Sequence, residues 1–393
     1  MRAPITDLIH HPYTAPAGFG APQPGVFKAS TVFFPNVAAM RARDWKTKDG
    51  YTYGLHGTPT TFLLEERIAA LEGGRQCLLV PSGLAALANV NLSLLRSGDE
   101  VLLPDNAYGP SRAMAEGELA QWGIGHQRYD PMNVDDLARR IGPRTRLVWL
   151  EAPGSVTLEF PPLERLAALC RERGVTSALD NTWGAGLAFN GLEAGADIVV
   201  QALTKYPSGG GDVLMGSVVT RDEDLHLRLK LTHMRLGWGV GANDVESVLR
   251  SLPSLALRYR AQDAAARVLA RWLSDRPEVA LVLHPGLEGS PGHANWRATC
   301  GPDGLAAGLF SIVLHEHHAP ARVDAFCDAL RLFRLGYSWG GPISLVAPYE
   351  PSAMRSPELG TWPHRGTLVR LSVGLEAVED LQADLAAALA QLA

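Results

Sequence analysis

From about Arg75 onward, short apolar runs alternate with stretches of helical periodicity. The apolar runs are CLLV, EVLLP, TRLVWLE and VTSALD, followed by the paired runs DIVVQAL and VLMGSVV; helical patterns cover Leu84 to Leu95, the region near Ala113 to Gln121, and LERLAALCRERG. Strands that alternate with helices of this length are joined by right-handed crossovers into a mostly parallel sheet. The pattern therefore predicts a central α/β domain.

The segments on either side of this domain differ from it in composition and in the order of strand and helix patterns. The first residues are rich in proline and glycine, which is typical of an arm with little structure of its own. After about Asn243 a long helical pattern, interrupted near Pro253, is followed by strands and helices without strict alternation, which indicates a smaller α+β domain. We predict three parts: an arm at 1–57 that contacts the neighbouring subunit, the α/β domain at 58–245 and the α+β domain at 246–393.

Composition narrows the classes of function. The 393 residues are 46% hydrophobic and 20% charged, as in a globular protein with two substantial cores. A net charge of -5 offers no general attraction for nucleic acid or anionic membranes. The four cysteines are scattered, which fits a reducing compartment, and no stretch is apolar for the ~20 residues that a membrane helix requires. We expect a cytoplasmic protein that binds neither nucleic acid nor membrane.

Four elements of the central domain fall at strand ends, where an open parallel sheet places its ligands. In PSGLAALAN, Ser82 and Gly83 begin a helix, and the free backbone amides there suit a phosphate, although Ser is also an ordinary helix cap. In LDNTWGAG, Asp180 ends an apolar strand, where its carboxylate could pair with a protonated ring nitrogen or simply form a turn.

The other two elements carry an aromatic ring and an amine. In DNAYGPS, Tyr108 lies in a loop and is suited to stack on a flat ligand, although a half-exposed loop tyrosine is an equal alternative. In QALTKYPSGGGD, Lys205 follows a strand beside Thr204 and precedes glycines that allow close backbone approach, although most lysines are surface charges. Together these four elements favour pyridoxal 5'-phosphate as the ligand. This cofactor requires a lysine that forms a Schiff base and an acidic residue that pairs with its ring nitrogen, and the helix start and the tyrosine suit its phosphate and its ring.

The run HEHH, His315 to His318, has the composition of a metal-binding cluster. It directly follows an apolar strand, and no second cluster supports it, so a solvated turn is the better interpretation. We expect no metal site.

Motifs spread from about residue 50 to 376 resemble the Cys/Met-metabolism enzymes that depend on pyridoxal phosphate: TYGLHGTPT, LEGG, PSGLAALAN, DNAYGPS, LDNTWGAG, ALTKYPSGGGD, YSWGG and LVRLSVGLE. Within that family, YSWGG and LEAPGSVTLE are most similar to the bacterial cystathionine beta-lyases. The resemblance implies fold type I of the pyridoxal-phosphate transferases, which is aspartate aminotransferase-like. It also implies a homodimer with shared active sites, and we expect two dimers to form a homotetramer.

The resemblance further implies roles for the cofactor residues. Lys205 would carry the cofactor, Asp180 would keep its ring nitrogen protonated, and Tyr108 would stack on its ring. The phosphate would be bound within the subunit by Ser82, Gly83, Leu84 and Thr204.

Other matched positions concern the substrate. Arg370, helped by Ser338, would hold the carboxylate of a sulfur amino acid, because a guanidinium binds a carboxylate with two parallel hydrogen bonds. Trp339 would line the side-chain pocket, and Tyr53 would reach the phosphate and substrate in the active site of the partner chain.

Three positions depart from the family pattern. Leu55 stands where the family has an arginine that binds the phosphate of the neighbouring chain, so His56 or another basic group substitutes, or cofactor affinity is weaker. Gly210 lies in GGGD, where the family usually has histidine, and Ile343 lies where a glutamate is expected. These departures bear on the substrate more than on the chemistry.

The predicted function is β-elimination from L-cystathionine, giving homocysteine, pyruvate and ammonia. Alternatives are a beta-lyase of other cysteine S-conjugates and a cystathionine gamma-lyase or gamma-synthase. A non-catalytic or regulatory protein with the same fold is a further alternative of a different class.

Overall fold

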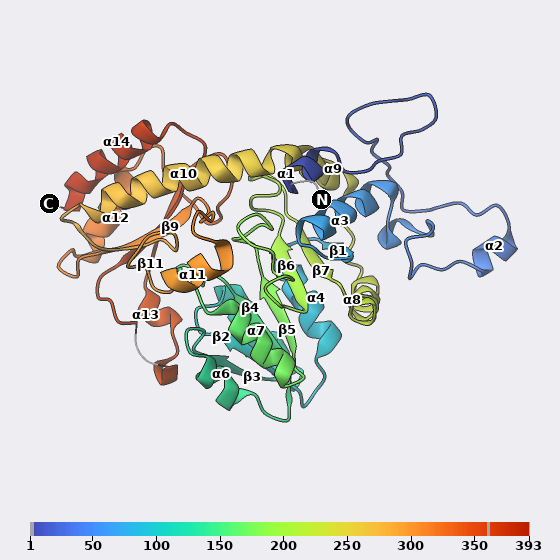
Figure 1. The fold of residues 1–393 in the computed structure, drawn as a ribbon, viewed down its shortest axis with the longest axis horizontal. Helices are drawn as coiled ribbons and strands as arrows, with labels where there is room; N and C mark the ends of the chain where they lie inside the picture. Colours follow the sequence, from blue (N-terminus) through green and yellow to red (C-terminus); the bar gives the residue numbers. More distant parts are fainter. Residues whose placement is uncertain (1–3, 360–361, 393) are drawn as a thin grey trace.

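The computed structural model describes residues 4–359 and 362–392. Its larger sheet is formed by β1 (Gln76–Val80), β2 (Glu100–Pro104), β3 (Gly125–Tyr129), β4 (Thr145–Glu151), β5 (Thr176–Asp180), β6 (Ile198–Ala202) and β7 (Gly216–Thr220). The spatial order is β1-β7-β6-β5-β4-β2-β3 (Figure 1). β7 is antiparallel to both of its neighbours, and the other pairs in the sheet are parallel. The mostly parallel α/β sheet is as the alternation predicts.

Helices cover both faces of this sheet. They are α3 (Pro59–Leu71), α4 (Gly83–Leu94), α5 (Gly109–Met114), α6 (Val134–Arg140), α7 (Leu163–Glu172) and α8 (Glu223–Leu236). Because side chains alternate between faces, Val101 of β2 packs in the core that includes α4 and α8, and Leu102 packs in the core that includes α3 and α7. A strand buried on both faces is continuously apolar, which explains the runs in the sequence.

The predicted helix near Ala113 to Gln121 begins earlier than expected. α5 starts at Gly109, and a π-helical turn at Ala115–Leu119 continues it. Pro110 occupies the first turn of α5, where its missing N–H costs no helical hydrogen bond. Tyr108 therefore directly precedes a helix.

The C-terminal part has a second sheet, formed by β8 (Val279–Leu283), β9 (Leu309–Leu314), β10 (Arg334–Leu335), β11 (Leu345–Tyr349) and β12 (Leu368–Ser372), in the order β10-β11-β12-β9-β8. The helices of this part are α9 (Ala242–Ser251), α10 (Leu255–Ser274), α11 (His293–Cys300), α12 (Pro320–Ala329), α13 (Pro351–Met354) and α14 (Val378–Leu389). A 3-10 turn at Leu252–Ser254 separates α9 from α10, so the interruption predicted near Pro253 is confirmed. α10 runs along the top of Figure 1 and packs on β8 and β9.

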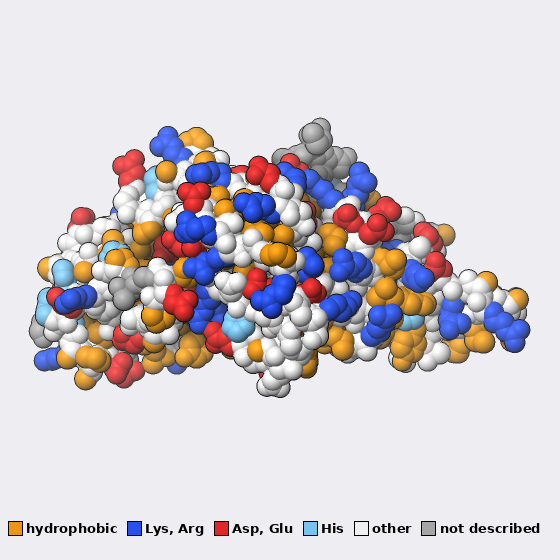
Figure 2. Space-filling view, turned by 90° about the horizontal axis from the view of Figure 1, so that it is seen from below, with side chains coloured by type: hydrophobic (Ala, Val, Ile, Leu, Met, Phe, Trp, Pro, Cys, Tyr) orange, Lys and Arg blue, Asp and Glu red, His pale blue; other side chains and the backbone are white. Residues whose placement is uncertain are grey.

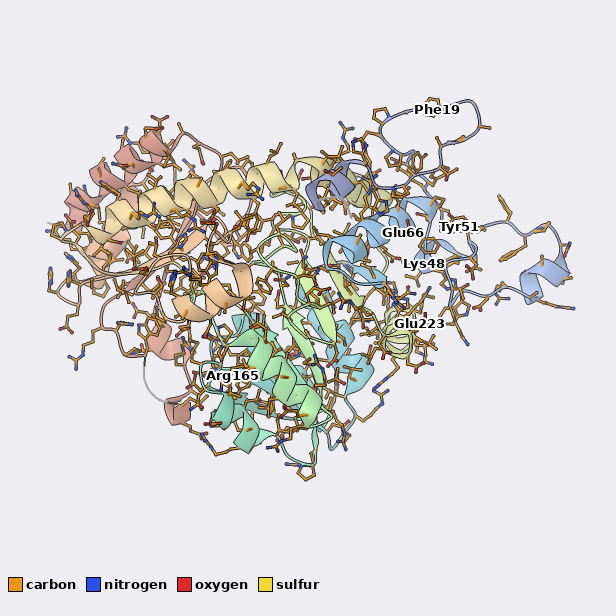
Figure 3. The ribbon with its side chains drawn as sticks, viewed as in Figure 1. Phe19, Lys48, Tyr51, Glu66, Arg165 and Glu223 are labelled. Atoms are coloured by element: carbon orange, nitrogen blue, oxygen red, sulfur yellow. The ribbon has the colours of Figure 1, made fainter. Side chains whose placement is uncertain are left out.

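The N-terminal segment packs on the body through α1 (Pro4–Ile9), where Leu8 is buried, and the part that follows extends away from it. The segment also contains α2 (Val37–Arg41) and a 3-10 turn at Gly54–His56, and the rest of it is irregular (Figure 1). Phe19 lies on a projecting loop (Figure 3), and hydrophobic side chains are exposed along the extension at the right of Figure 2. Residues 1–3 of the predicted arm lie outside the described residues, and the domain boundaries at 57 and 245 stay predictions.

No helix in the described ranges is long and apolar enough to cross a membrane. Within the same ranges, no group of three or more His, Cys, Asp or Glu side chains could hold a metal ion. At the HEHH run, the rings of His317 and His318 lie 4.2 Å apart.

Candidate active site

A cavity of about 650 Å³ lies where the carboxyl ends of β4, β5 and β6 face the second sheet. This volume is in the range of small-molecule and cofactor sites. The wall contains these residues predicted from the sequence: Ser82, Gly83, Leu84, Tyr108, Asp180, Thr204, Lys205, Ser338, Trp339 and Arg370. The fold therefore brings together side chains that lie far apart in the chain, from Ser82 to Arg370.

Lys205 follows β6 and extends its amine into the cavity. Its Nζ donates a hydrogen bond to Ser338 Oγ at 2.7 Å and lies 5.6 Å from the centre of the Trp339 ring. Burial and then the Arg370 charge lower the pKa of Lys205 to about 8, against the opposing effect of the Asp180 charge. A neutral amine is therefore accessible near physiological pH, as a nucleophile or general base requires.

Ser338 is held in an unusual backbone conformation. Its φ of 99° lies in the region that favours glycine, although it carries a side chain. Such a conformation costs of order 1–3 kcal/mol and persists only where the surrounding structure imposes it. Here it presents the hydroxyl to Lys205.

Two carboxyl groups lie side by side at the ends of β4 and β5. Asp180 accepts hydrogen bonds from the backbone N–H and the hydroxyl of Thr182. Burial raises the pKa of Asp180, whereas the Thr182 bonds and the charge of Lys205 oppose this shift. Glu151 is the partner of Asp180 in the strand register, and the carboxyl groups of both residues line the cavity.

Tyr108 places a half-exposed phenol ring in the same wall. Its backbone N–H donates to Glu151 Oε2 at 2.8 Å. Burial and then the charges of Asp180 and Glu151 raise the pKa of the phenol, so it stays protonated at neutral pH and can donate a proton.

The start of α4 forms a concave backbone surface. Ser82 Oγ accepts the N–H of Ala85 at 3.0 Å, so this side chain is a helix cap as well as a wall residue. A Cβ at Gly83 would lie 2.6 Å from the Cβ of Ala202, so only glycine fits without displacement. The first amides of a helix have no intrahelical acceptor and favour an anion. Thr204 Oγ1 exchanges hydrogen bonds with the backbone of Met215 nearby.

Arg370 reaches the cavity from the second sheet. It lies on β12, its residue is 8% exposed, and its guanidinium is 5.1 Å from the centre of the Tyr349 ring. A buried guanidinium beside an aromatic face is well placed to bind a carboxylate.

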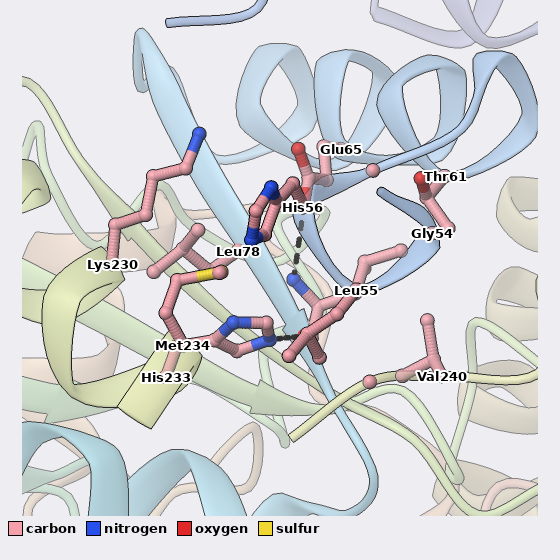
Figure 4. Close-up of a pocket in the computed structure, with 13 residues that line it drawn as sticks. Gly54, Leu55, His56, Thr61, Glu65, Leu78, Lys230, His233, Met234 and Val240 are labelled. Carbon is pink, nitrogen blue, oxygen red and sulfur yellow. Dashed lines mark hydrogen bonds between the residues drawn. The ribbon is translucent and has the colours of Figure 1, made fainter. Parts of the chain in front are cut away.

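Among the described residues, Tyr53 does not line the cavity of its own chain, and it is half-exposed. Leu55 lines a separate pocket of about 20 Å³ with Val240, His233 and Lys230 (Figure 4). His56 is bonded to Thr52, and burial together with the Lys230 charge lowers its pKa. Neither Leu55 nor His56 reaches the cavity of its own chain. Gly210 and Ile343 are exposed and also lie outside the described wall.

Among the wall residues that sequence reasoning missed are Glu151, Thr182, Trp183, Tyr337 and Tyr349. Glu151 ends the apolar run TRLVWLE, so the strand-end rule that selected Asp180 would have found it. The two tyrosines come from the part without regular alternation, where the sequence carries no comparable signal.

These residues fit pyridoxal 5'-phosphate. The helix start and Gly83 suit its phosphate, the Asp180 carboxyl group suits a protonated ring nitrogen, and Lys205 suits covalent attachment. Trp183 adds a buried indole N–H with no hydrogen-bond partner among the described residues.

Comparison with known proteins gives a consistent result. The family model described as "Cys/Met metabolism PLP-dependent enzyme" matches residues 5–390. A "Cystathionine beta-lyase" of Bordetella avium is 36% identical over 98% of this chain and 97% of its own length. An "L-methionine gamma-lyase" of Pseudomonas putida is 33% identical over 98% of this chain and 96% of its own length. A crystal structure of cystathionine gamma synthase from Xanthomonas oryzae, in complex with aminoacrylate and cysteine, has a TM-score of 0.89 at 30% identity and covers 100% of this chain and 99% of that one.

Proposed function

Because this chain belongs to the pyridoxal-phosphate-dependent enzymes of Cys/Met metabolism and has their fold type I architecture, we propose that it is a carbon-sulfur lyase that cleaves L-cystathionine by β-elimination. The observation that carries the proposal is the pairing of one amine base with one phenol acid in a single cavity. Lys205 has a lowered pKa and Tyr108 a raised one.

In this proposal the cofactor, when bound, supplies an electron sink for the electron pair left on the α carbon. Arg370 holds the substrate carboxylate and so fixes the orientation of the α carbon. Lys205 takes the α proton on Nζ, and Ser338 keeps that amine directed into the cavity. Tyr108 gives its phenol proton to the sulfur that leaves the β carbon. Hydrolysis of the remaining three-carbon fragment yields pyruvate and ammonia.

Relatives named cystathionine beta-lyase support β- over γ-chemistry, since several of them match this chain over 98% of its length. A γ-elimination requires a further proton removal from the β carbon, and the single lysine of the described wall could act as the base in either reaction. A gamma-lyase remains the second candidate, because a relative with that name matches nearly the whole chain.

The test is to mix the cofactor-loaded protein with L-cystathionine and to identify the products, with Lys205→Ala as the control. We expect pyruvate and homocysteine from the wild type and neither from the variant. Release of 2-oxobutyrate and cysteine would instead establish a gamma-lyase. No product from either protein would favour another cysteine conjugate or a non-catalytic role.

We also propose a homodimer with shared active sites, and a tetramer of two dimers. Tyr53 lies outside the described wall of its own cavity, and the arm exposes apolar side chains such as Phe33, which is 93% exposed. Mixing Tyr53→Ala and Lys205→Ala subunits tests this directly. Hybrid dimers should regain part of the activity that each variant lacks, and failure to do so would place Tyr53 outside the neighbouring site.

A further inference from the structure

Glu151 lines the cavity and has no part in the reaction proposed above. Its strand β4 pairs in parallel with β5, and its partner in the register is Asp180. Paired residues of neighbouring strands face the same side, and the strands are ~4.8 Å apart. The two carboxyl groups therefore lie close together, yet each has its own donors: Thr182 for Asp180 and Tyr108 for Glu151.

The bond from Tyr108 to Glu151 fixes a particular point of the loop between β2 and α5. The N–H groups of Asp105 and Ala107, in the same loop, donate to backbone carbonyl groups at 2.9 and 3.0 Å. Tyr108 directly precedes α5, and its N–H donates to Glu151 Oε2 at 2.8 Å. Glu151 is therefore the side chain that ties the end of β4 to the backbone of the stacking residue.

The backbone of Tyr108 is held on both sides: its carbonyl accepts the N–H of Ser111 at 2.9 Å, and its N–H donates to Glu151. The residue is 43% exposed, so close packing does not hold the ring from all sides. The phenol direction follows the backbone of Tyr108, and Glu151 holds that backbone.

The charge balance at Glu151 is consistent with such an anchor. Burial and then the Asp180 charge raise the pKa of Glu151 well above its usual value, and the Tyr108 N–H, the Arg112 charge and the Ser155 N–H oppose this shift. A carboxyl oxygen can accept the Tyr108 N–H whether or not the group is protonated, so the contact does not depend on the ionised form. No comparable contact exists between Glu151 and Lys205, the proposed base, among the hydrogen bonds of the described residues.

We propose that Glu151 is a positioning residue whose carboxyl oxygen holds the backbone of Tyr108 so that the phenol ring lies against the cofactor ring. The proposal rests on the function proposed above, because that function assigns the stacking role to Tyr108. Glu151 itself exchanges no proton with the substrate.

The test compares two variants of similar size. Glu151→Leu removes the acceptor, whereas Glu151→Gln keeps an amide oxygen that can accept the Tyr108 N–H. The readouts, taken without substrate, are the dissociation constant of pyridoxal 5'-phosphate and the visible circular dichroism of the bound cofactor. We expect Glu151→Leu to weaken binding by about tenfold or more and to change the dichroic band, and Glu151→Gln to restore both.

The matched control is Asp197→Asn. Asp197 accepts the backbone N–H of Ser177 at 2.8 Å, near the opposite end of β5 from the cavity. This variant should leave the band and the affinity unchanged. If Glu151→Leu does not fold, Glu151→Ala gives the same comparison with Glu151→Gln.

Two results would overturn the positioning role: a Leu variant with wild-type affinity and dichroism, or a Gln variant as defective as the Leu variant. Failure of the proposed function has a different signature. In that case Glu151→Leu alters the cofactor band as expected, but the wild type releases no pyruvate from L-cystathionine.

Discussion

Replacing Lys205 with methionine should stabilise the cofactor-free protein. Methionine has a similar length but no charge, and the folded state lowers the pKa of Lys205 from 10.5 to about 8, chiefly by burial. At about 1.4 kcal/mol per pKa unit, the ammonium costs the folded state about 3 kcal/mol at pH 7. Loss of the hydrogen bond to Ser338 offsets about 1 kcal/mol of the stability gained by removing the ammonium. The expected net gain in unfolding free energy is about 2 kcal/mol.

The gain should depend on pH in a defined direction. Between pH 8 and 10.5 the unfolded chain binds the Lys205 proton and the folded chain does not, so wild-type stability rises with pH across this window. Lys205→Met lacks the group, so its advantage is full below pH 8 and disappears above about pH 10.5.

Urea unfolding of the cofactor-free proteins at pH 7 and pH 10 measures this effect. Protein concentration must be matched, because subunit association also contributes to stability. Lys28→Met, at an exposed position, controls for the general effect of removing a lysine. A variant no more stable than wild type at pH 7, or with the same advantage at both pH values, would show that Lys205 is not a desolvated amine.

Three further substitutions test separate parts of the cavity. Gly83→Ala puts a Cβ 2.6 Å from the Cβ of Ala202 and should weaken cofactor binding by about tenfold, measured by titration; an unchanged affinity would contradict the phosphate cradle. Arg370→Lys keeps the charge but loses the bidentate geometry, so KM for the amino acid should rise about tenfold while kcat changes less; steady-state kinetics with an unchanged KM would remove Arg370 from the carboxylate site. Leu55→Arg should tighten cofactor binding, and an equal dissociation constant would mean that position 55 does not face the neighbouring phosphate.

Sequence patterns predicted the fold where strands are buried on both faces and missed it where they are not. β4 and β6 are recognisable in the sequence as continuous apolar runs, because helices cover both faces of the sheet there. β3 is an edge strand that pairs only with β2, and its segment GHQRY includes His126 and Arg128, so it shows no apolar run. The short β10 is exposed and was missed for the same reason.

The candidate site was predictable to the extent that it follows from strand ends. Asp180 and Lys205 follow buried strands of one sheet, so parallel topology alone brings them together. Ser338 and Arg370 could be assigned only through resemblance, because their approach depends on how the second sheet packs against the first. Glu151 satisfied the strand-end rule, but its hydrogen bond to Tyr108 is a long-range contact that periodicity does not encode.

Different residues of the cavity wall come from the two sheets. Lys205, Asp180 and Tyr108 extend from the larger sheet, whereas Arg370 and Tyr349 lie on the smaller one. The two sets of residues are nevertheless coupled, because the Arg370 charge contributes to the lowered pKa of Lys205. Under the roles proposed above, a substitution that removes the Arg370 charge should therefore change both the hold on the substrate carboxylate and the pH at which the Lys205 amine becomes neutral.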